Sequence, residues 1–365
     1  MKINIMDAGL RDKGGHHFDI DRNVVRHLVQ AGHDVRIYTF VSALDEVKDA
    51  LEVYAPVERI LRPFFYVEPD TVDFFAGELT MFLRHAEGLA QDLRNVRDAD
   101  LWFWPTMAPQ DLLACAWVKP EAAVVGCIHE DLGIATRSIG AQAWRYALLE
   151  AHRRKLRFTP GSVEPELRFR FMEIVPEGRF IVFPHPFDGE PIEQPKTELK
   201  RIGIFGHQRP EKGMNVLAGL MGRLVRDGYN VLFQDSWGHP KSIDHPNIEL
   251  LDYVEDLNEP LKSCDLIVLP YDVERYRTHG SGILAHCFIL GIPVIGPFAT
   301  IPGRLIEQYD VGPLFQRNQG PSLYAAVKMA QANYPRYAAN AFKLSRHYSK
   351  ENGSAQFAAA ALKHA

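Results

Sequence analysis

The chain has 365 residues, of which 46% are hydrophobic and 24% charged, and its formal net charge at pH 7 is −5. This length suits two domains of ordinary size, and this composition is typical of globular proteins rather than of disordered or fibrous ones. Because 41 basic residues are balanced by 46 acidic ones, the chain lacks the overall positive field of many nucleic-acid-binding proteins, and we expect no nucleic-acid partner.

The sequence predicts neither export nor a membrane span. Residues 1–9 form a short apolar strand followed by charges, without the longer apolar stretch of a secretory signal. No apolar run approaches the ~20 residues that cross a bilayer, although a basic helix face could still make peripheral contact with a membrane surface. The four cysteines, at positions 115, 127, 264 and 287, stand singly, which predicts neither zinc site nor disulfides and favours the cytoplasm.

Short apolar strands alternate with amphipathic helical stretches along the chain, a pattern typical of parallel sheets covered by helices on both faces. In the first half it predicts helices near 19–30, 78–96, 141–154 and 164–173, between strands at 3–6, 35–40, 101–104, 122–128, 156–159 and 180–183. The proline-rich segment 184–200 is predicted to be a linker. The pattern then restarts, with strands at 201–205, 230–234, 248–251, 265–270 and 293–296 and helices at 214–226 and 282–290.

The predicted fold class is therefore α/β, with two Rossmann-like domains facing each other across a cleft. Residues 1–188 make up the N-terminal domain, and residues 189–344 make up the C-terminal domain. A break at Pro335 would let a C-terminal helix over 345–365 pack back on the N-terminal domain. Because open parallel sheets bind ligands at the carboxyl ends of their strands, residues that follow a strand are the candidates for a site.

A glycine-rich loop that includes Gly14, Gly15 and His16 follows the first strand and leads into the first helix. Backbone N–H groups at such a helix start can bind an anion or a sugar, and the alternative is a tight turn. The spacing is not G-x-G-x-x-G, so a dinucleotide fingerprint is absent. His16 and His17 have no third ligand close in sequence, so we interpret them as a polar loop and expect no metal site.

The first strand of the second half is followed by the segment Gly206-His207-Gln-Arg209-Pro-Glu-Lys212-Gly. Arg209 and Lys212 precede a helix whose N-terminus adds positive potential, and a diphosphate would fit there. The alternative is a solvated loop, but the position at the carboxyl end of a strand favours ligand binding.

A third segment opens the helix predicted at 282–290. His279, Gly280, Ser281 and Gly282 come before or at its first turn, where unpaired N–H groups again favour an anion. His286 lies four residues after Gly282 and so on the same helix face. For this histidine, contact with a ribose or phosphate and a partly buried structural role both stay open.

The strand predicted at 122–128 ends in His129, Glu130 and Asp131. An imidazole at the carboxyl tip of a buried strand can hydrogen-bond a sugar hydroxyl or relay a proton, which makes His129 a catalytic candidate. Glu130 and Asp131 can equally cap the following segment.

In this order, these residues resemble the group 1, family 4-like, retaining glycosyltransferases, which have the GT-B fold. The resemblance rests on Gly14-Gly15, on the G-H-x-V pattern at 32–35, on His129, on the hinge-like segment 182–188, on residues 206–213 and on the G-x-P-V-I pattern at 291–295. The family's arginine after the first glycine of the 206–213 segment is His207 here. Its paired-glutamate motif is not retained, because Thr278 and His286 stand at the two positions.

The resemblance implies roles for several of these residues. Lys212, with Arg209 as a substitute for the missing arginine, would bind the donor diphosphate, and His129 would lie beside the transferred sugar. Metal independence, the absence of a cofactor and a nucleoside diphosphate sugar as donor substrate are implied as well. The remaining donor-binding residues would be Gly206, His207, Tyr253, Val254, His279, Gly280, Ser281, Gly282 and His286.

The sequence thus predicts a hexosyltransferase-like, metal-independent glycosyltransferase. It would move a sugar from a nucleoside diphosphate, held by the C-terminal domain, to an unknown acceptor held by the N-terminal domain, with retention of configuration. Two alternatives stay open, namely a relative that binds a sugar or nucleotide without transfer, suggested by Thr278 and His286, and a sugar-nucleotide epimerase.

Overall fold

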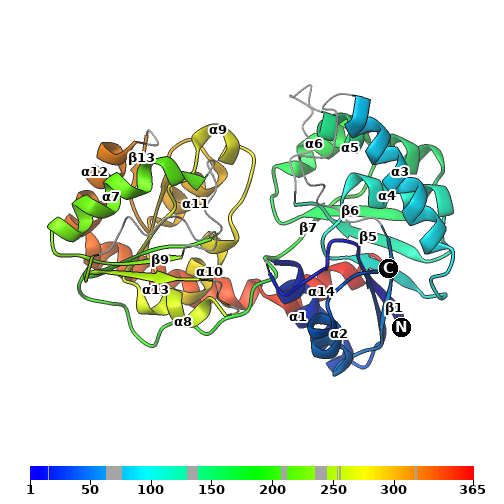
Figure 1. Ribbon diagram of the computed structural model, residues 1–365, viewed down its shortest axis with the longest axis horizontal. Helices are drawn as coiled ribbons and strands as arrows, with labels where there is room; N and C mark the ends of the chain where they lie inside the picture. The colour runs from blue at the N-terminus through cyan, green and yellow to red at the C-terminus, as the bar shows by residue number, and fades with distance from the viewer. Residues whose placement is uncertain are drawn as a thin grey trace. The chain divides into compact units, whose positions relative to one another are not determined.

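The computed structural model describes residues 1–14, 16–62, 76–129, 139–206, 212–234, 245–252, 254, 256–316 and 319–365. The chain divides into two compact units (Figure 1). Unit 1 comprises Met1–Pro186 and Ser354–Ala365, and unit 2 comprises Phe187–Gly353. Residues 183–200, all of them described, form neither helix nor strand, as the prolines of this segment predict.

Unit 1 is built on a parallel sheet whose described strands run in the order β3-β2-β1-β4-β5-β6-β7. The strands are β1 (Lys2–Asp7), β2 (Asp34–Phe40), β3 (Val57–Leu61), β4 (Leu101–Trp104), β5 (Ala123–Cys127), β6 (Phe158–Ser162) and β7 (Ile181–Val182). The strand order reverses between β1 and β4. In an open α/β sheet, ligands bind beyond the carboxyl ends of the strands at such a switch point.

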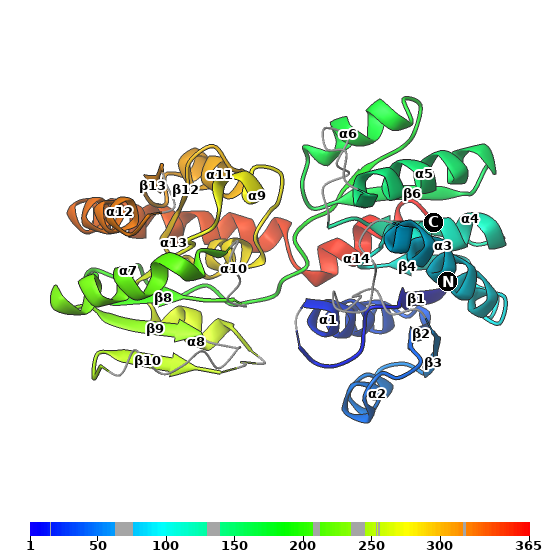
Figure 2. The ribbon, with the colours of Figure 1, turned by 45° about the horizontal axis from the view of Figure 1, so that its top comes forward.

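Helices cover both faces of this sheet (Figure 2). They are α1 (His16–Gln30), α2 (Asp45–Glu52), α3 (Ala76–Leu93), α4 (Pro109–Val118), α5 (Ile139–Arg153), α6 (Leu167–Ile174) and α14 (Ser354–Leu362). Successive residues of a strand point to opposite faces. Trp102 and Trp104 of β4 accordingly pack in the core that α3 to α6 cover, whereas Phe103 between them packs in the core beneath α1, α2 and α14.

The end of the chain returns to unit 1 at α14. This helix packs against α1, and its Phe357 lies with ring centroids 4.7 Å from Phe183 and 5.6 Å from Phe103. The Ser354 hydroxyl donates a 2.9 Å hydrogen bond to the carbonyl of Pro186. Residues 345–351 belong to α13 (Tyr334–Glu351) of unit 2, where Pro335 lies in the first turn and costs no intrahelical hydrogen bond.

Unit 2 repeats the architecture, with described parallel strands in the order β10-β9-β8-β11-β12-β13. The strands are β8 (Arg201–Ile204), β9 (Asn230–Gln234), β10 (Ile248–Leu251), β11 (Leu266–Val268), β12 (Val294–Pro297) and β13 (Leu314–Phe315). The helices before α13 are α7 (Met214–Arg226), α8 (Asn258–Ser263), α9 (Val273–Tyr276), α10 (Gly282–Leu290), α11 (Ile301–Tyr309) and α12 (Gly320–Ala332). The predicted α/β class with two Rossmann-like units is confirmed.

Candidate functional site

In unit 1, a buried ion pair lies at the carboxyl end of β1. Asp7, the last residue of the strand, accepts the N–H of Gly9 at 2.7 Å on Oδ1 and contacts Nδ1 of His17 at 2.7 Å on Oδ2. A Cβ atom on Gly9 would lie 2.6 Å from Cε1 of His17, so only glycine allows this approach. His17 is buried in the first turn of α1, and its interpretation as part of a polar loop is wrong.

A second carboxyl group, Asp21, lies one helical turn beyond His17 and is also fully buried. Burial and the negative charge of Asp7 raise the pKa of Asp21 well above its ordinary value. Burial opposes protonation of His17, but the Asp7 carboxylate outweighs burial and the pKa of His17 is raised. Both shifts favour the protonated forms of Asp21 and His17 beside Asp7.

His16 and His129 extend this group towards β5. The His16 ring stacks on His17 at 4.6 Å between centroids and lies 5.6 Å from the ring of His129. His129 follows β5, and its Nε2 donates to the carbonyl of Pro105, just beyond β4, at 3.0 Å. Burial lowers the pKa of His129, so the ring is neutral with its proton on Nε2, and Nδ1 is left as an acceptor. The switch point of the sheet thus carries three histidines.

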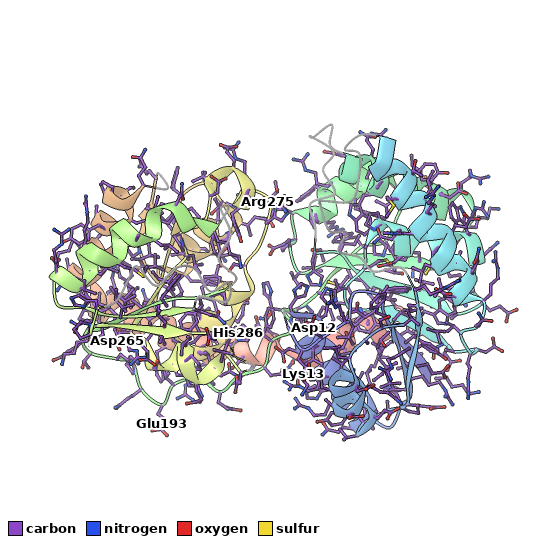
Figure 3. All side chains as sticks on the ribbon, viewed as in Figure 1. Asp12, Lys13, Glu193, Asp265, Arg275 and His286 are labelled. Carbon is purple, nitrogen blue, oxygen red and sulfur yellow. The ribbon has the colours of Figure 1, made fainter. Side chains whose placement is uncertain are left out.

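The glycine-rich loop before α1 is described only in part. Gly14 is exposed, and its N–H donates to Oδ1 of Asp12 at 2.8 Å. Figure 3 labels Asp12 and Lys13 in this loop of unit 1. Gly15, like Glu130 and Asp131 after β5, lies outside the described residues. Within the described part of the chain, no three His, Cys, Asp or Glu side chains are arranged to hold a metal ion.

In unit 2, Lys212 lies close to the carboxyl end of β8. Gly206 follows that strand with a φ of +94°, and a Cβ atom on it would lie 2.9 Å from Nζ of Lys212. Gly213 then begins α7 with a φ of +78°, and a Cβ atom on it would lie 2.0 Å from the carbonyl oxygen of Pro270. The two glycines therefore let the backbone fold tightly enough to hold the Lys212 ammonium over the strand end.

Tyr271 connects Lys212 with the start of α10. The ammonium of Lys212 lies 6.0 Å from the centroid of the Tyr271 ring, and the Tyr271 hydroxyl lies 3.0 Å from Oγ of Ser281. Ser281 is the N-cap of α10 and accepts the N–H of Leu284 at 3.2 Å. The remaining N–H groups of the first turn have no intrahelical acceptor. A lysine and a helix N-terminus thus adjoin each other at one edge of the sheet, which is a combination suited to an anion.

His286 lies one turn inside α10, where Figure 3 labels it. Its ring packs 4.5 Å from that of Phe187, and its buried Nδ1 has no hydrogen-bond partner among the described residues. Burial lowers the pKa of His286 to about 4, against the opposing charges of Asp256 and Asp188. The imidazole is therefore neutral at pH 7 and offers one unsatisfied nitrogen near the helix start.

Some of the other predicted residues of unit 2 lie close to Ser281 or β10, and others lie outside the described residues. Gly280 and His279 are half-buried beside Ser281, and Nδ1 of His279 lies 3.3 Å from the hydroxyl of Thr278. Gly282 opens α10 close to Phe187, whose Cζ would lie 3.1 Å from an added Cβ atom. Val254 is half-buried beyond β10. His207, Arg209 and Tyr253 lie outside the described residues.

The sequence analysis missed several residues around Asp7 in unit 1 and around Lys212 in unit 2. Asp7 and Asp21 were not candidates, although an aspartate that ends a buried strand beside a glycine-rich loop is a usable signal. Tyr271 follows β11 at the same sheet edge as Lys212, and only the strand order shows that it lies between Lys212 and Ser281.

Two parallel Rossmann-like sheets in one chain are the architecture of the GT-B glycosyltransferases, and solved structures of that class superpose on this chain. The sucrose-phosphate synthase of Thermosynechococcus elongatus matches with a TM-score of 0.68 at 13% identity, covering 100% of this chain and 97% of its own. Anabaena HepE in complex with UDP matches with a TM-score of 0.68 at 15% identity, covering 100% and 99%. SnogD of Streptomyces nogalater matches with a TM-score of 0.61 at 18% identity, covering 100% and 99%.

The comparisons by sequence found no relative. No family model and no curated protein matches the chain. At the identities of the structural matches, the likeness establishes the GT-B fold, and the chemistry has to be argued from the residues of the two groups described above.

Proposed function

We propose that the protein is a glycosyltransferase that takes a sugar from a nucleoside diphosphate bound by unit 2 and gives it to an acceptor bound by unit 1. The observation that carries the proposal is the chain of contacts Lys212–Tyr271–Ser281, which joins an ammonium group to the N-terminus of α10. The chain also shares its fold with Anabaena HepE, whose structures hold UDP and UDP-glucose.

The diphosphate is the part of the donor that this corner of unit 2 suits best. The Lys212 ammonium and the first N–H groups of α10 would bind its oxygens, and Arg209 and His207 precede Lys212 in the same segment. These groups supply the positive charge that stabilises a leaving diphosphate. A metal ion is not needed for that purpose, and we propose a metal-independent reaction.

The rest of the donor would be bound by the neighbouring segments. His286 would present its neutral Nδ1 to a donor hydroxyl at the position where the resembling family has a glutamate. His279 and residues 280–282 would line the phosphates together with Gly206. Tyr253 and Val254, beyond β10, would bind the base.

In unit 1, His129 is proposed to contact the transferred sugar. Its Nδ1 accepts a hydrogen bond because Nε2 is committed to Pro105. Gly14, Gly15 and His16 would bind the acceptor or a phosphate near it. Transfer would retain configuration, with the leaving diphosphate helping to remove the acceptor proton. We place the enzyme in the cytoplasm, where four buried, unpaired cysteines are ordinary.

The direct test is incubation of the protein with UDP-, GDP- and ADP-sugars and a panel of sugar and lipid-linked acceptors. Release of the nucleoside diphosphate with formation of a new glycoside supports the proposal, and NMR of the product's anomeric proton reports retention or inversion. An epimerised donor without a new glycoside would instead identify an epimerase.

Binding without turnover is the second candidate function. The neutral His286 favours it, because an uncharged imidazole stands where the resembling family has a carboxylate. One experiment distinguishes sugar transfer from binding without transfer. A nucleotide sugar that binds tightly but stays intact after prolonged incubation with every acceptor would support the binding function and exclude transfer.

A further inference from the structure

Unit 1 carries four large apolar side chains that are exposed on two neighbouring helices. On α5, Tyr146 is 49% and Leu149 is 44% exposed, and on α6, Phe169 is 69% and Met172 is 40% exposed. Tyr146 and Leu149, like Phe169 and Met172, are three residues apart, so each pair lies on one side of its helix. Large apolar side chains that gather in this way are unusual on a surface that only water covers.

The two exposed pairs belong to one outer layer. Trp144 and Leu148 of α5 and Phe171 and Ile174 of α6 are all buried in the same core beneath these helices. The two helices also contact each other, and both views show them side by side (Figures 1 and 2). Their outward sides therefore lie on the same side of unit 1. We call the outward residues of α5 and α6, with Arg154, the α5–α6 face.

This face is basic in a chain whose net charge is −5. It includes five arginines, namely Arg145, Arg153, Arg154, Arg168 and Arg170. The acidic residues within the two helices are Glu150 and Glu173, both paired with these arginines, and the exposed Glu166 directly precedes α6. Glu150 is buried with an ion pair to Arg153 at 2.7 Å and another to Arg154, and Glu173 pairs with Arg170 at 3.8 Å.

We propose that the α5–α6 face docks on the surface of an anionic membrane. Aromatic and aliphatic side chains on a helix face enter the boundary between headgroups and acyl chains, while arginines beside them bind lipid phosphates. Positive charges near an anionic lipid surface add to this attraction. Because the rest of the chain carries a net negative charge, such a membrane would select this face and set the orientation of unit 1. No helix in the described ranges is long and apolar enough to cross a bilayer, so the contact is peripheral.

A protein partner is the less favoured occupant. Four arginines within the two helices, with Arg154 directly after α5, outnumber the two glutamates of these helices and match the negative charge of phospholipid headgroups. Arg145 precedes Tyr146 and two arginines flank Phe169 in the sequence, whereas the core of a stable protein interface is depleted of charged residues. The proposal is independent of the transfer reaction, because none of these residues belongs to the candidate site.

Co-sedimentation with vesicles tests the proposal on the full chain. Vesicles of phosphatidylcholine mixed with the anionic lipid phosphatidylglycerol are compared with vesicles of phosphatidylcholine alone at low and at high salt. We expect binding to the anionic vesicles only, with a loss at high salt because the charges are then screened. Phe169→Ser and Arg168→Glu should each weaken this binding about tenfold or more.

Two controls make the result specific to the face. Phe298→Ser removes a comparably exposed phenylalanine, 48% exposed, from unit 2, and Arg226→Glu reverses an exposed arginine on α7. Both should bind vesicles as the unchanged protein does, and all variants should melt at the same temperature because the side chains are exposed. Absence of binding to anionic vesicles at low salt, or equal binding by Phe169→Ser and Phe298→Ser, would overturn the proposal. So would a dimer in solution that Phe169→Ser dissociates, because the face would then be a protein interface.

Discussion

Nδ1 of His17 lies 2.7 Å from Oδ2 of Asp7, and the two side chains form a buried ion pair between the end of β1 and the first turn of α1. The pair fixes the start of α1 beside the strand end where unit 1 is proposed to bind the acceptor. Its contribution to folding depends on pH, because it requires a protonated His17.

Replacement of Asp7 by Asn should destabilise unit 1 by about 2–4 kcal/mol at pH 6, because it removes the partner of a buried charge. The raised pKa of His17 makes its stabilising effect complete below 6.5, the ordinary histidine value. That effect is lost as the pH rises through the higher pKa of the folded state. The cost of Asp7→Asn, measured by chemical unfolding, should therefore be smaller at pH 9 than at pH 6.

The matched control for this substitution is Asp45→Asn, which removes an aspartate that pairs with Arg59 at 2.8 Å but has 83% of its side chain exposed. An exposed pair contributes less than about 1 kcal/mol. If Asp7→Asn proved as mild as Asp45→Asn at both pH values, the buried pair would not stabilise unit 1 as described.

Asp21 should lower the stability of the fold as the pH rises, whereas an ordinary paired carboxylate raises it. Its pKa is raised in the folded state by burial and by Asp7, so its ionisation destabilises the fold as the pH rises above the ordinary value of 3.8 and through the folded value. Asp21→Asn cannot ionise. Melting curves should show this variant at least as stable as the unchanged protein at pH 8, with the difference shrinking towards pH 4; a clear loss of stability at pH 8 would refute the protonated Asp21.

The lowered pKa of His286 predicts that acid destabilises unit 2. An unfolded chain protonates this imidazole near pH 6.5, whereas the folded chain resists until about pH 4. Unfolding is therefore favoured by up to about 3 kcal/mol as the pH falls through that window. His286→Gln should lose less stability than the unchanged protein between pH 7 and pH 4.5, while His152→Gln, at an exposed histidine of α5, should behave as the unchanged protein. An unaltered pH profile in His286→Gln would mean that this imidazole does not resist protonation.

Gly206 provides a test of the Lys212 position that separates binding from backbone strain. Gly206→Ala places a methyl group 2.9 Å from the present position of Nζ of Lys212, at a φ of +94°. Gly228→Ala has similar strain, with a φ of +85°, but meets no atom within 4 Å. Each should lose about 1 kcal/mol of stability, and only Gly206→Ala should weaken nucleoside diphosphate binding in calorimetry. If both variants bound the nucleoside diphosphate with equal affinity, Lys212 would not belong to the donor site.

The layered architecture was predictable because its signals are local. Apolar strands such as β4 and β5, buried on both faces, stand out from the amphipathic helices between them. The edge strand β3 was missed, since Glu58 and Arg59 interrupt its apolar pattern and only its end residues are buried. The strand β13 was missed too, because two residues carry no periodicity.

The candidate site was predictable in part for the same reason. Lys212 and Ser281 lie next to glycines and helix starts, which the sequence displays directly. The pairing of Asp7 with His17 depends on how tightly the loop at Gly9 folds, and the bridging place of Tyr271 depends on the order of the strands. Neither feature has a local pattern, so His17 was misread and Tyr271 was not considered.

The central claim is that Lys212 and the start of α10 bind a nucleoside diphosphate. The most direct measurement is isothermal titration of the unchanged protein, Lys212→Ala and Lys343→Ala, an exposed lysine on α13, with UDP, GDP and ADP. We expect one of the three to bind the unchanged protein and Lys343→Ala equally, and Lys212→Ala about 10- to 100-fold more weakly, the loss expected for a charge-assisted hydrogen bond. Equal affinity for Lys212→Ala, or no binding of any of the three by the unchanged protein, would contradict the account.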